Sequence, residues 1–502
     1  MLAAFSGIPG RPRSSGSSGT TSTFSARRRG TDRVAAGVLV SGLVAASVLA
    51  GAGAASADEP PQRQGGATAA IGGLKTYGQA VIHEDTGDQQ VSAGLFEMSV
   101  DGGGTLQTYC VDIHNPTQKD AKYQETPWSG TSLGTNKDAG KIRWILQNSY
   151  PQVNDLAALA RKAGARGLTE QDAAAGTQVA IWRYSDGAHV DAADPGAEKL
   201  ADYLTKSARG MGEPQASLTL DPPAVSGHPG ERIGPVTVHT NAGAVSVSAP
   251  EDAATSGVRI TDKTGKVVTS ATNGSRLFFD IPADDAADDA ADGAHEASGE
   301  AGGGAGAARL TVQASTTVPV GRAFASESRS QTQILAGSSE STVSATASAS
   351  WAEEGPIPAL SARKNCAKGG VDITAANTGD RPFSFKLLGF EHTIPAGASR
   401  TVTIPLQEDQ AYDFTITGPN GFKHRFIGIL DCKTQSSEGG PSTQTVSEPS
   451  PATVGNTTGG PNLAATGGTS TTPVIAGVAI GFVLIGGAAL ILLRKNEAPA
   501  GD

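Results

Sequence analysis

Apolar and polar residues follow two periodicities in the first part of the chain. Residues 71–108 alternate in short runs that Gly and Asp interrupt, which is typical of β-strands. The residues that follow repeat their apolar positions at helical spacing instead. The predicted helices span residues 141–150, 155–165, 169–185 and 197–209. The pattern therefore predicts an α+β domain over residues 71–211, with the strands first and the helices afterwards.

The third of these helices has the clearest boundaries. Thr169 can cap its first turn, and Asp172 three residues later completes the pattern of a capping box. The run Ser185-Asp186-Gly187 ends it, because Gly adopts the left-handed conformation that follows many helices. We therefore expect one continuous helix between these two signals.

The pattern changes again after residue 215. Residues 215–351 show short alternating runs without a convincing helix, which predicts a β-sandwich of the immunoglobulin-like kind. An acidic tract rich in Ala and Gly, residues 283–308, interrupts this domain. Its carboxylates can bind calcium or simply be solvated, and the lack of rigid ligand spacing favours a solvated insertion. A second all-β domain is predicted over residues 358–433.

The N-terminal segment has the pattern of an export signal. Residues 34–54 are apolar, follow a cluster of arginines and end in Ala55-Ser56-Ala57, the kind of site at which signal peptidase cuts. We therefore predict a signal peptide over residues 1–57. The alternative is an uncleaved membrane anchor.

The C-terminal segment combines three features in order. The motif Leu463-Ala464-Ala465-Thr466-Gly467 precedes an apolar span at residues 474–493, and a basic pair follows the span. Residues 463–502 thereby resemble the sorting signal of LAXTG-type sortase substrates. The resemblance implies that a sortase cuts between Thr466 and Gly467 and joins Thr466 to peptidoglycan.

Composition indicates modest domains separated by solvated linkers. The 502 residues include 65 Gly and 28 Pro, while aromatic residues make up only 5%. Residues 435–462, rich in Ser, Thr, Pro and Gly, are expected to form an extended linker through the wall. The formal net charge of -10 and the lack of clustered Lys and Arg in the mature region argue against nucleic acid as a partner.

Three cysteines in an exported chain leave one thiol over. Cys366 and Cys432 bracket the last β domain, which predicts a disulfide between its two edges. Closing that loop would stabilise the domain by roughly 4 kcal/mol. Cys110 remains in another domain, where a buried and inert cysteine is the ordinary interpretation.

Two motifs give Cys110 a further interpretation. Residues 109–116 have the pattern Tyr-Cys-x-Asp-x-x-x-Pro, and residues 177–182 have the pattern Thr-Gln-x-Ala-Ile-Trp. In this order and at this separation they resemble the thioester domains of Gram-positive and actinobacterial surface adhesins, over residues 71–211. The resemblance implies that the Cys110 thiolate attacks the side-chain amide of Gln178, that ammonia leaves, and that an internal thioester remains.

The side chains around both motifs fit this chemistry. A thiolate is a strong nucleophile, and a primary carboxamide releases ammonia once the fold holds both groups together and supplies donors to the oxyanion. Ile181 and Trp182 share the helical face of Gln178, and with Tyr109 they would exclude water. The full set of candidate supporting residues is Tyr109, Asp112, His114, Thr177, Ile181 and Trp182.

Two residues are candidates for the proton acceptor. If Cys110 lies on a strand, the side chains of Asp112 and His114 point the same way as the thiol. Either of them would then take the thiol proton or deprotonate an incoming amine. Asp112 can equally orient a backbone turn, and His114 can be a simple surface residue.

The resemblance implies a covalent adhesin that reacts once, not an enzyme that turns over. A lysine amine or another nucleophile on a surface macromolecule would attack the acyl group of Gln178, at the outer face of the cell wall. Two alternatives are a passive wall-anchored stalk and, ranked lower, a cysteine-dependent peptidase or transpeptidase with His83, His114 or His189 as base. No cofactor is expected and no metal-ligand motif is recognisable.

Overall fold

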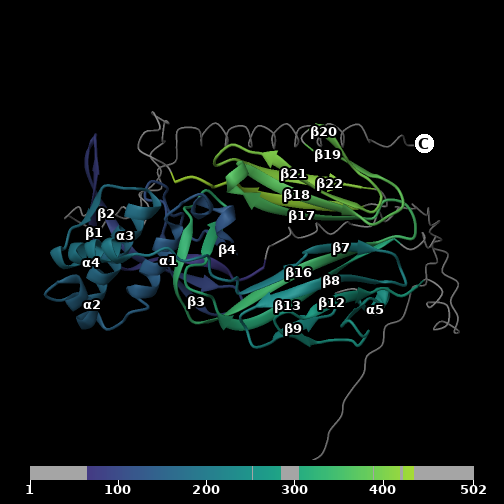
Figure 1. Cartoon of the computed structure of the whole chain (residues 1–502), viewed down its shortest axis with the longest axis horizontal. Helices are drawn as coiled ribbons and strands as arrows, with labels where there is room; N and C mark the ends of the chain where they lie inside the picture. Colours follow the sequence, from purple (N-terminus) through teal and green to yellow (C-terminus); the bar gives the residue numbers. More distant parts are fainter. Residues whose placement is uncertain (1–64, 251–252, 284–304, 388, 419–421, 435–502) are drawn as a thin grey trace, which may run out of the picture. The chain divides into compact units, whose positions relative to one another are not determined.

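A computed structural model describes residues 65–250, 253–283, 305–387, 389–418 and 422–434 (Figure 1). The predicted signal peptide, the wall linker, the LAXTG motif and the apolar span at 474–493 lie outside these residues. Within the described part, no helix is both long and apolar enough to cross a membrane.

The four predicted helices are present. They are α1 (Ala139–Asn148), α2 (Leu156–Ala163), α3 (Glu170–Ser185) and α4 (Pro195–Ser207). The predicted capping box starts α3, since the Thr169 side chain accepts from the Asp172 backbone and the Asp172 side chain accepts from the Thr169 backbone. Helix α3 contacts β1 (Thr68–Glu84), β2 (Gly87–Val100) and α4, and most of its residues are therefore buried.

The strands of the helical part form a closed antiparallel circuit. Its order is β1, β2, β3 (Thr105–Cys110), β15 (Gln333–Ser338), β14 (Ala323–Ser326), β4 (Lys122–Thr126) and back to β1, with β5 (Val190–Ala192) attached to β1. Every pairing between neighbours is antiparallel. We call this circuit the barrel.

Two strands of the barrel come from an unexpected part of the chain. The hairpin β14–β15 lies within residues 215–351, which we expected to form a separate sandwich, yet it pairs with β4 and β3. The alternating pattern of this segment predicts strands but does not say which sheet they join. The α+β part is thus completed by residues more than a hundred positions beyond its last helix.

The other described residues within 215–351 form two sheets, and most of the predicted acidic insertion at 283–308 lies outside the described residues. One has the order β10 (Arg259–Thr261), β12 (Arg276–Asp280), β8 (Arg232–Thr240) and β6 (Leu218–Asp221), and the other has the order β11 (Ser270–Ala271), β9 (Val245–Ser248), β13 (Gly306–Thr317), β16 (Glu340–Trp351) and β7 (Ala224–Gly227). A four-residue helix, α5 (Ala253–Ser256), was not expected there. The apolar core of these sheets is continuous with that of the barrel.

The last β domain has a core of its own. Its strands are β17 (Pro358–Asn365), β18 (Gly370–Asn377), β19 (Phe383–Leu387), β20 (Phe390–Ile394), β21 (Ala398–Pro405), β22 (Ala411–Thr417) and β23 (Lys423–Ile429). Phe383, Ile373 and Phe426 lie in that core. The predicted disulfide is confirmed: Cys366 follows β17 and Cys432 follows β23, with 5.1 Å between their Cα atoms.

A buried ion pair ties β4 to the residue just before β14, and the same carboxylate also binds the backbone just before β6. Glu125 of β4 accepts from Arg322 Nε at 2.8 Å, and the two side chains are only 1% and 4% exposed. The Glu125 carboxylate also accepts from the backbone of Ser217 at 3.0 Å and of Ala67 at 3.2 Å. Because all these partners converge on Glu125, its charge is buried with its hydrogen bonds satisfied.

We expect the substitution Arg322→Met to lower the free energy of unfolding by about 3–5 kcal/mol, because it leaves the Glu125 carboxylate buried without its cation. Urea denaturation followed by circular dichroism measures this loss. The control is Arg329→Met, which alters an exposed arginine of the β14–β15 loop and should change stability by less than about 0.5 kcal/mol. Equal losses in both variants would contradict the role of the ion pair.

Candidate functional site

Cys110 is the last residue of β3 and lies inside the barrel core. Its side chain is only 1% exposed, and the neighbouring Tyr109 is fully buried. Strand β3 has β2 on one side and β15 on the other. In the register of β3 with β15, the residue directly opposite Cys110 is Gln333.

Gln178 reaches Cys110 from α3, as the two motifs suggested, but it contacts the backbone. Its Oε1 accepts from the Cys110 N–H at 3.0 Å, and its Nε2 donates to the Cys110 carbonyl at 2.9 Å. Both ends of the carboxamide are therefore engaged by the main chain of one residue. Such a pair of hydrogen bonds fixes the last residue of β3 against α3.

Gln333 is the residue that faces the sulfur. Its Nε2 lies 3.3 Å from Cys110 Sγ, and its Oε1 accepts from the Thr108 hydroxyl at 2.9 Å. Gln333 and Thr108 are both fully buried. Sequence reasoning missed Gln333, because the only signal was a polar residue at the start of a short apolar strand far from either motif.

A second contact to the sulfur comes from the loop after β3. Thr117 Oγ1 lies 3.9 Å from Cys110 Sγ and accepts from Gln331 Nε2 at 2.6 Å. Tyr123 of β4 binds the backbone of Gln331, since its hydroxyl donates to the Gln331 carbonyl at 3.0 Å. Sequence reasoning singled out none of these three residues.

Burial keeps the thiol protonated. The loss of solvent raises the pKa of Cys110 to about 12, and the hydrogen bonds from Gln333 and Thr117 oppose this rise only in part. The carboxylates of Asp112 and Asp186 add to it by charge repulsion. The sequence suggested a thiolate, whereas the folded site holds a neutral thiol at physiological pH.

Asp112 and Asp186 lie on two sides of the turn that follows β3. Asp112 Oδ1 accepts from the backbone of His114 at 3.1 Å and of Asn115 at 3.2 Å, so that Asp112 shapes the turn. Asp186, at the end of α3, accepts from the backbone of Ile113 at 3.2 Å. Burial, followed by repulsion from Asp112, raises the pKa of Asp186 well above its usual range.

The other predicted supporting residues contact the protein backbone or are packed in the core. Tyr109 donates its hydroxyl to the Tyr150 carbonyl at 2.9 Å. The Thr177 hydroxyl donates to the Ala173 carbonyl one turn earlier in α3 at 2.6 Å. Ile181 and Trp182 are buried on the same helix as Gln178.

Within the described part of the chain, none of the histidines proposed for a peptidase, His83, His114 or His189, hydrogen-bonds to the Cys110 sulfur. Among the described residues, the hydrogen-bonding neighbours of Cys110 Sγ are Gln333 and Thr117. His83 Nδ1 instead lies 2.8 Å from Asp88 Oδ1, and His114 Nδ1 lies 3.8 Å from Glu84 Oε1. Burial lowers the pKa of His114, the opposite of what a charged partner of a thiolate needs. The contacts give no support to a Cys–His pair.

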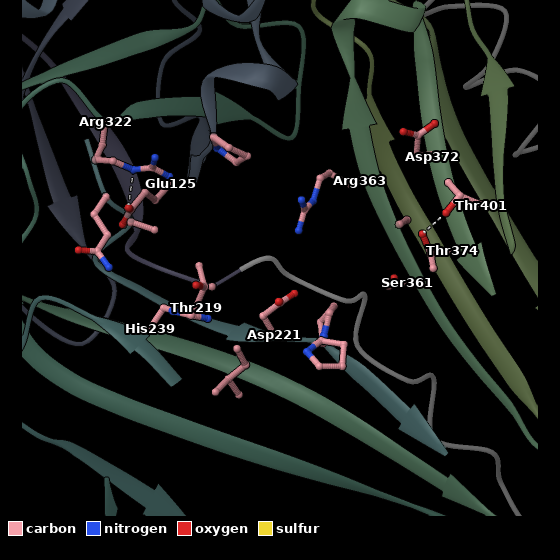
Figure 2. A pocket seen from close by; sticks show the side chains of 18 residues that line it. Glu125, Thr219, Asp221, His239, Arg322, Ser361, Arg363, Asp372, Thr374 and Thr401 are labelled. Carbon is pink, nitrogen blue, oxygen red and sulfur yellow. Dashed lines mark hydrogen bonds and ion pairs between the residues drawn. The ribbon is translucent and has the colours of Figure 1, made fainter. Parts of the chain in front are cut away.

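Outside this site, the described residues hold one group of possible metal ligands and a large cavity. Glu408, Asp409 and Asp431 of the last β domain bring carboxylate oxygens within 4.8 Å of one another. A cavity of about 690 Å³ is lined by side chains of both charges (Figure 2). Its labelled lining residues are Glu125, Thr219, Asp221, His239, Arg322, Ser361, Arg363, Asp372, Thr374 and Thr401. Neither Cys110 nor Gln333 is among its lining residues.

Two segments of the chain match known protein families. Residues 107–210 match the thioester domain, and residues 358–429 match the C-terminal domain of bacterial phospholipase C. The first match includes Cys110 and Gln178 but ends before Gln333. The chain is therefore similar to thioester-domain proteins across its helical part.

Solved structures give weaker likenesses. The TIE protein of Bacillus anthracis is 15% identical, with 72% of this chain and 64% of that chain covered and a TM-score of 0.26. The thioester domain of the Enterococcus faecium TIE86 protein is also 15% identical, with 57% of this chain and 97% of that chain covered and a TM-score of 0.25. No curated protein matches the chain.

The raised pKa of Cys110 predicts how the alkylation rate of this thiol depends on pH. In a Gln333→Ala chain, alkylation of the folded protein by iodoacetamide should keep accelerating above pH 9, because the thiolate becomes abundant only as the pH approaches about 12. In urea, the alkylation rate of the same chain should level off once the pH exceeds the ordinary thiol pKa of about 8.5. Intact-mass time courses measure both rates, and a folded rate that levels off as early as the unfolded one would contradict the effect of burial.

Proposed function

We propose that this chain binds a partner covalently, through an internal thioester between Cys110 and Gln333. The observation that carries the proposal is the contact of 3.3 Å between Gln333 Nε2 and Cys110 Sγ in a buried site. The match of residues 107–210 to the thioester domain supports the same chemistry.

The contacts of the two glutamines favour Gln333 as the acyl partner, and we revise the Gln178 assignment accordingly. The sulfur must reach the amide carbon, and the amide nitrogen must leave. The Gln333 nitrogen is the atom in contact with the sulfur, and its carbon is one bond further. Gln178 instead uses both amide atoms on the Cys110 backbone, and it positions the nucleophile.

Thioester formation then needs no outside reagent. Cys110 Sγ attacks the amide carbon of Gln333, negative charge develops on Oε1, and the thiol proton passes to Nε2. The carbon–nitrogen bond breaks, ammonia leaves, and a carbon–sulfur bond remains. The thiol of the buried site carries the proton that the leaving ammonia requires, so the step balances without an added acid.

Thr108 stabilises the charge that develops on the acyl oxygen. Its hydroxyl already donates to Gln333 Oε1 at 2.9 Å, and both residues are fully buried. A donor that is fixed before the reaction and shielded from water stabilises an oxyanion better than mobile solvent does. The same burial protects the finished thioester from hydrolysis.

The partner supplies the nucleophile of the second step. A neutral amine, in the expected case a lysine side chain on a surface macromolecule, attacks the acyl carbon of Gln333. The carbon–sulfur bond breaks, Cys110 regains a proton as a thiol, and an isopeptide joins partner and chain. The site is then spent, so the protein acts once and is not an enzyme.

The proposed setting is the outside of the cell wall, where the chain would serve as an adhesin. The signal pattern at residues 1–57 would export it, and a sortase would join Thr466 to peptidoglycan. Support for both steps comes from the order of the sequence motifs alone. The disulfide between Cys366 and Cys432 agrees with an oxidising location.

Intact mass tests the bond and its partner. We expect residues 58–434 to weigh one ammonia less than their sequence requires, once the disulfide is taken into account, and to gain one methylamine on incubation with it. Gln333→Ala should restore the calculated mass, because it removes the acyl group. Gln178→Ala should still lose ammonia, although more slowly, because it only loosens the Cys110 backbone.

The matched control is Gln152→Ala, which alters an exposed glutamine whose side chain donates to the Ala336 carbonyl of β15, the strand that carries Gln333. Its mass and methylamine uptake should equal those of the parent. An ammonia loss that disappears in Gln178→Ala but persists in Gln333→Ala would return the bond to Gln178. If the parent chain has its full calculated mass and a reactive Cys110 thiol, the thioester is excluded and the passive stalk is the remaining interpretation.

Removal of the Thr108 hydroxyl tests the oxyanion donor. Thr108→Val has nearly the same shape, and we expect it to slow methylamine uptake by roughly a hundredfold to a thousandfold, the cost of one oxyanion donor in a dry site. Thr108→Ser keeps the hydroxyl and should recover most of the rate. Mass spectrometry over time gives both rates, and a Val variant as fast as the parent would exclude this role.

A further inference from the structure

One polar atom beside the reacting groups has no partner. Gln331 is only 3% exposed, and its Oε1 makes no hydrogen bond to any described residue. The other end of the same carboxamide is engaged, since Nε2 donates to Thr117 Oγ1 at 2.6 Å. A buried acceptor without a donor is costly and rare, and it calls for a bound group that supplies the donor.

The position of Gln331 links this acceptor to the reaction. The Gln331 carboxamide is hydrogen-bonded to Thr117, whose Oγ1 lies 3.9 Å from Cys110 Sγ. Gln331 also precedes Gln333 by two residues in the sequence. The main chain of Gln331 is held by the Tyr123 hydroxyl at 3.0 Å. The carboxamide cannot turn away from this position without breaking the hydrogen bond from its Nε2 to Thr117.

We infer that Gln331 Oε1 is the binding site for the incoming amine, an inference that rests on the proposed thioester between Cys110 and Gln333. One N–H of a neutral amine donates to Gln331 Oε1, and this hydrogen bond turns the nitrogen lone pair toward the acyl carbon. The site thereby selects nucleophiles that carry a hydrogen-bond donor on the attacking atom. Tertiary amines and thioethers, which lack one, are not held.

Gln331→Met tests the inference with methylamine as the probe. The variant fills the same volume without an acceptor oxygen, so the ammonia loss should remain complete while methylamine uptake slows by roughly tenfold, the rate equivalent of one neutral hydrogen bond. Gln331→Glu keeps a carbonyl oxygen and, while protonated in this buried site, should recover most of the rate. The matched control is Thr261→Val, which removes another buried and unpartnered oxygen, on β10.

The outcomes separate the inference from the proposal on which it rests. A parent chain without ammonia loss overturns the thioester itself. A complete ammonia loss in Gln331→Met, with a methylamine rate equal to the parent, overturns the amine site alone. Equal slowing in Gln331→Met and Thr261→Val would show a general effect of core substitutions and would also overturn it. Thr117→Val is the second variant if Gln331→Met does not fold, and it should slow uptake by releasing the carboxamide.

Discussion

The pairing of β15 with β3 is the constraint on which the site depends. It places Gln333 directly opposite Cys110, although the two residues are 223 positions apart in the sequence. Register in a sheet moves in steps of one residue, and each step turns every side chain to the other face. A slip of β15 by one residue would therefore remove the carboxamide from the sulfur. The ion pair of Glu125 with Arg322, just before β14, fixes the same hairpin from its other strand.

Two glutamines contact Cys110 and a third contacts its neighbour Thr117, and these contacts distinguish the three carboxamides. Gln178 holds the backbone of the nucleophile, Gln333 presents its nitrogen to the sulfur, and Gln331 keeps an acceptor unpaired nearby. In the proposed mechanism, the same functional group serves for positioning, for acylation and for recognition. A carboxamide is suited to all three tasks because it offers a donor and an acceptor without carrying a charge into a dry core.

Local sequence signals were enough to predict the helices, but the pairing of strands that are far apart in the sequence was not predictable. The start of α3 followed from Thr169 and Asp172, because a cap involves residues three positions apart. The disulfide followed from two cysteines that bracket one domain. Gln333 carried no such signal, because its partner strand is set by tertiary packing and the alternation of residues 323–338 fits any sheet. The proximity of Gln178 to Cys110 was predicted, but a motif does not say whether a side chain faces a sulfur or a backbone.

The direct passage from β15 into β16 has a mechanical consequence. Only Ser339 separates the two strands, and β16 pairs with β13 along its whole length and with β7 on its other edge. A ligand attached at Gln333 and pulled against a tethered C-terminus would load the chain from that residue onward. Tension would pass along β16 parallel to its strand axis, so that the hydrogen bonds on both edges share the load in shear and do not open one after another. The barrel strands before Gln333 would stay outside this load path.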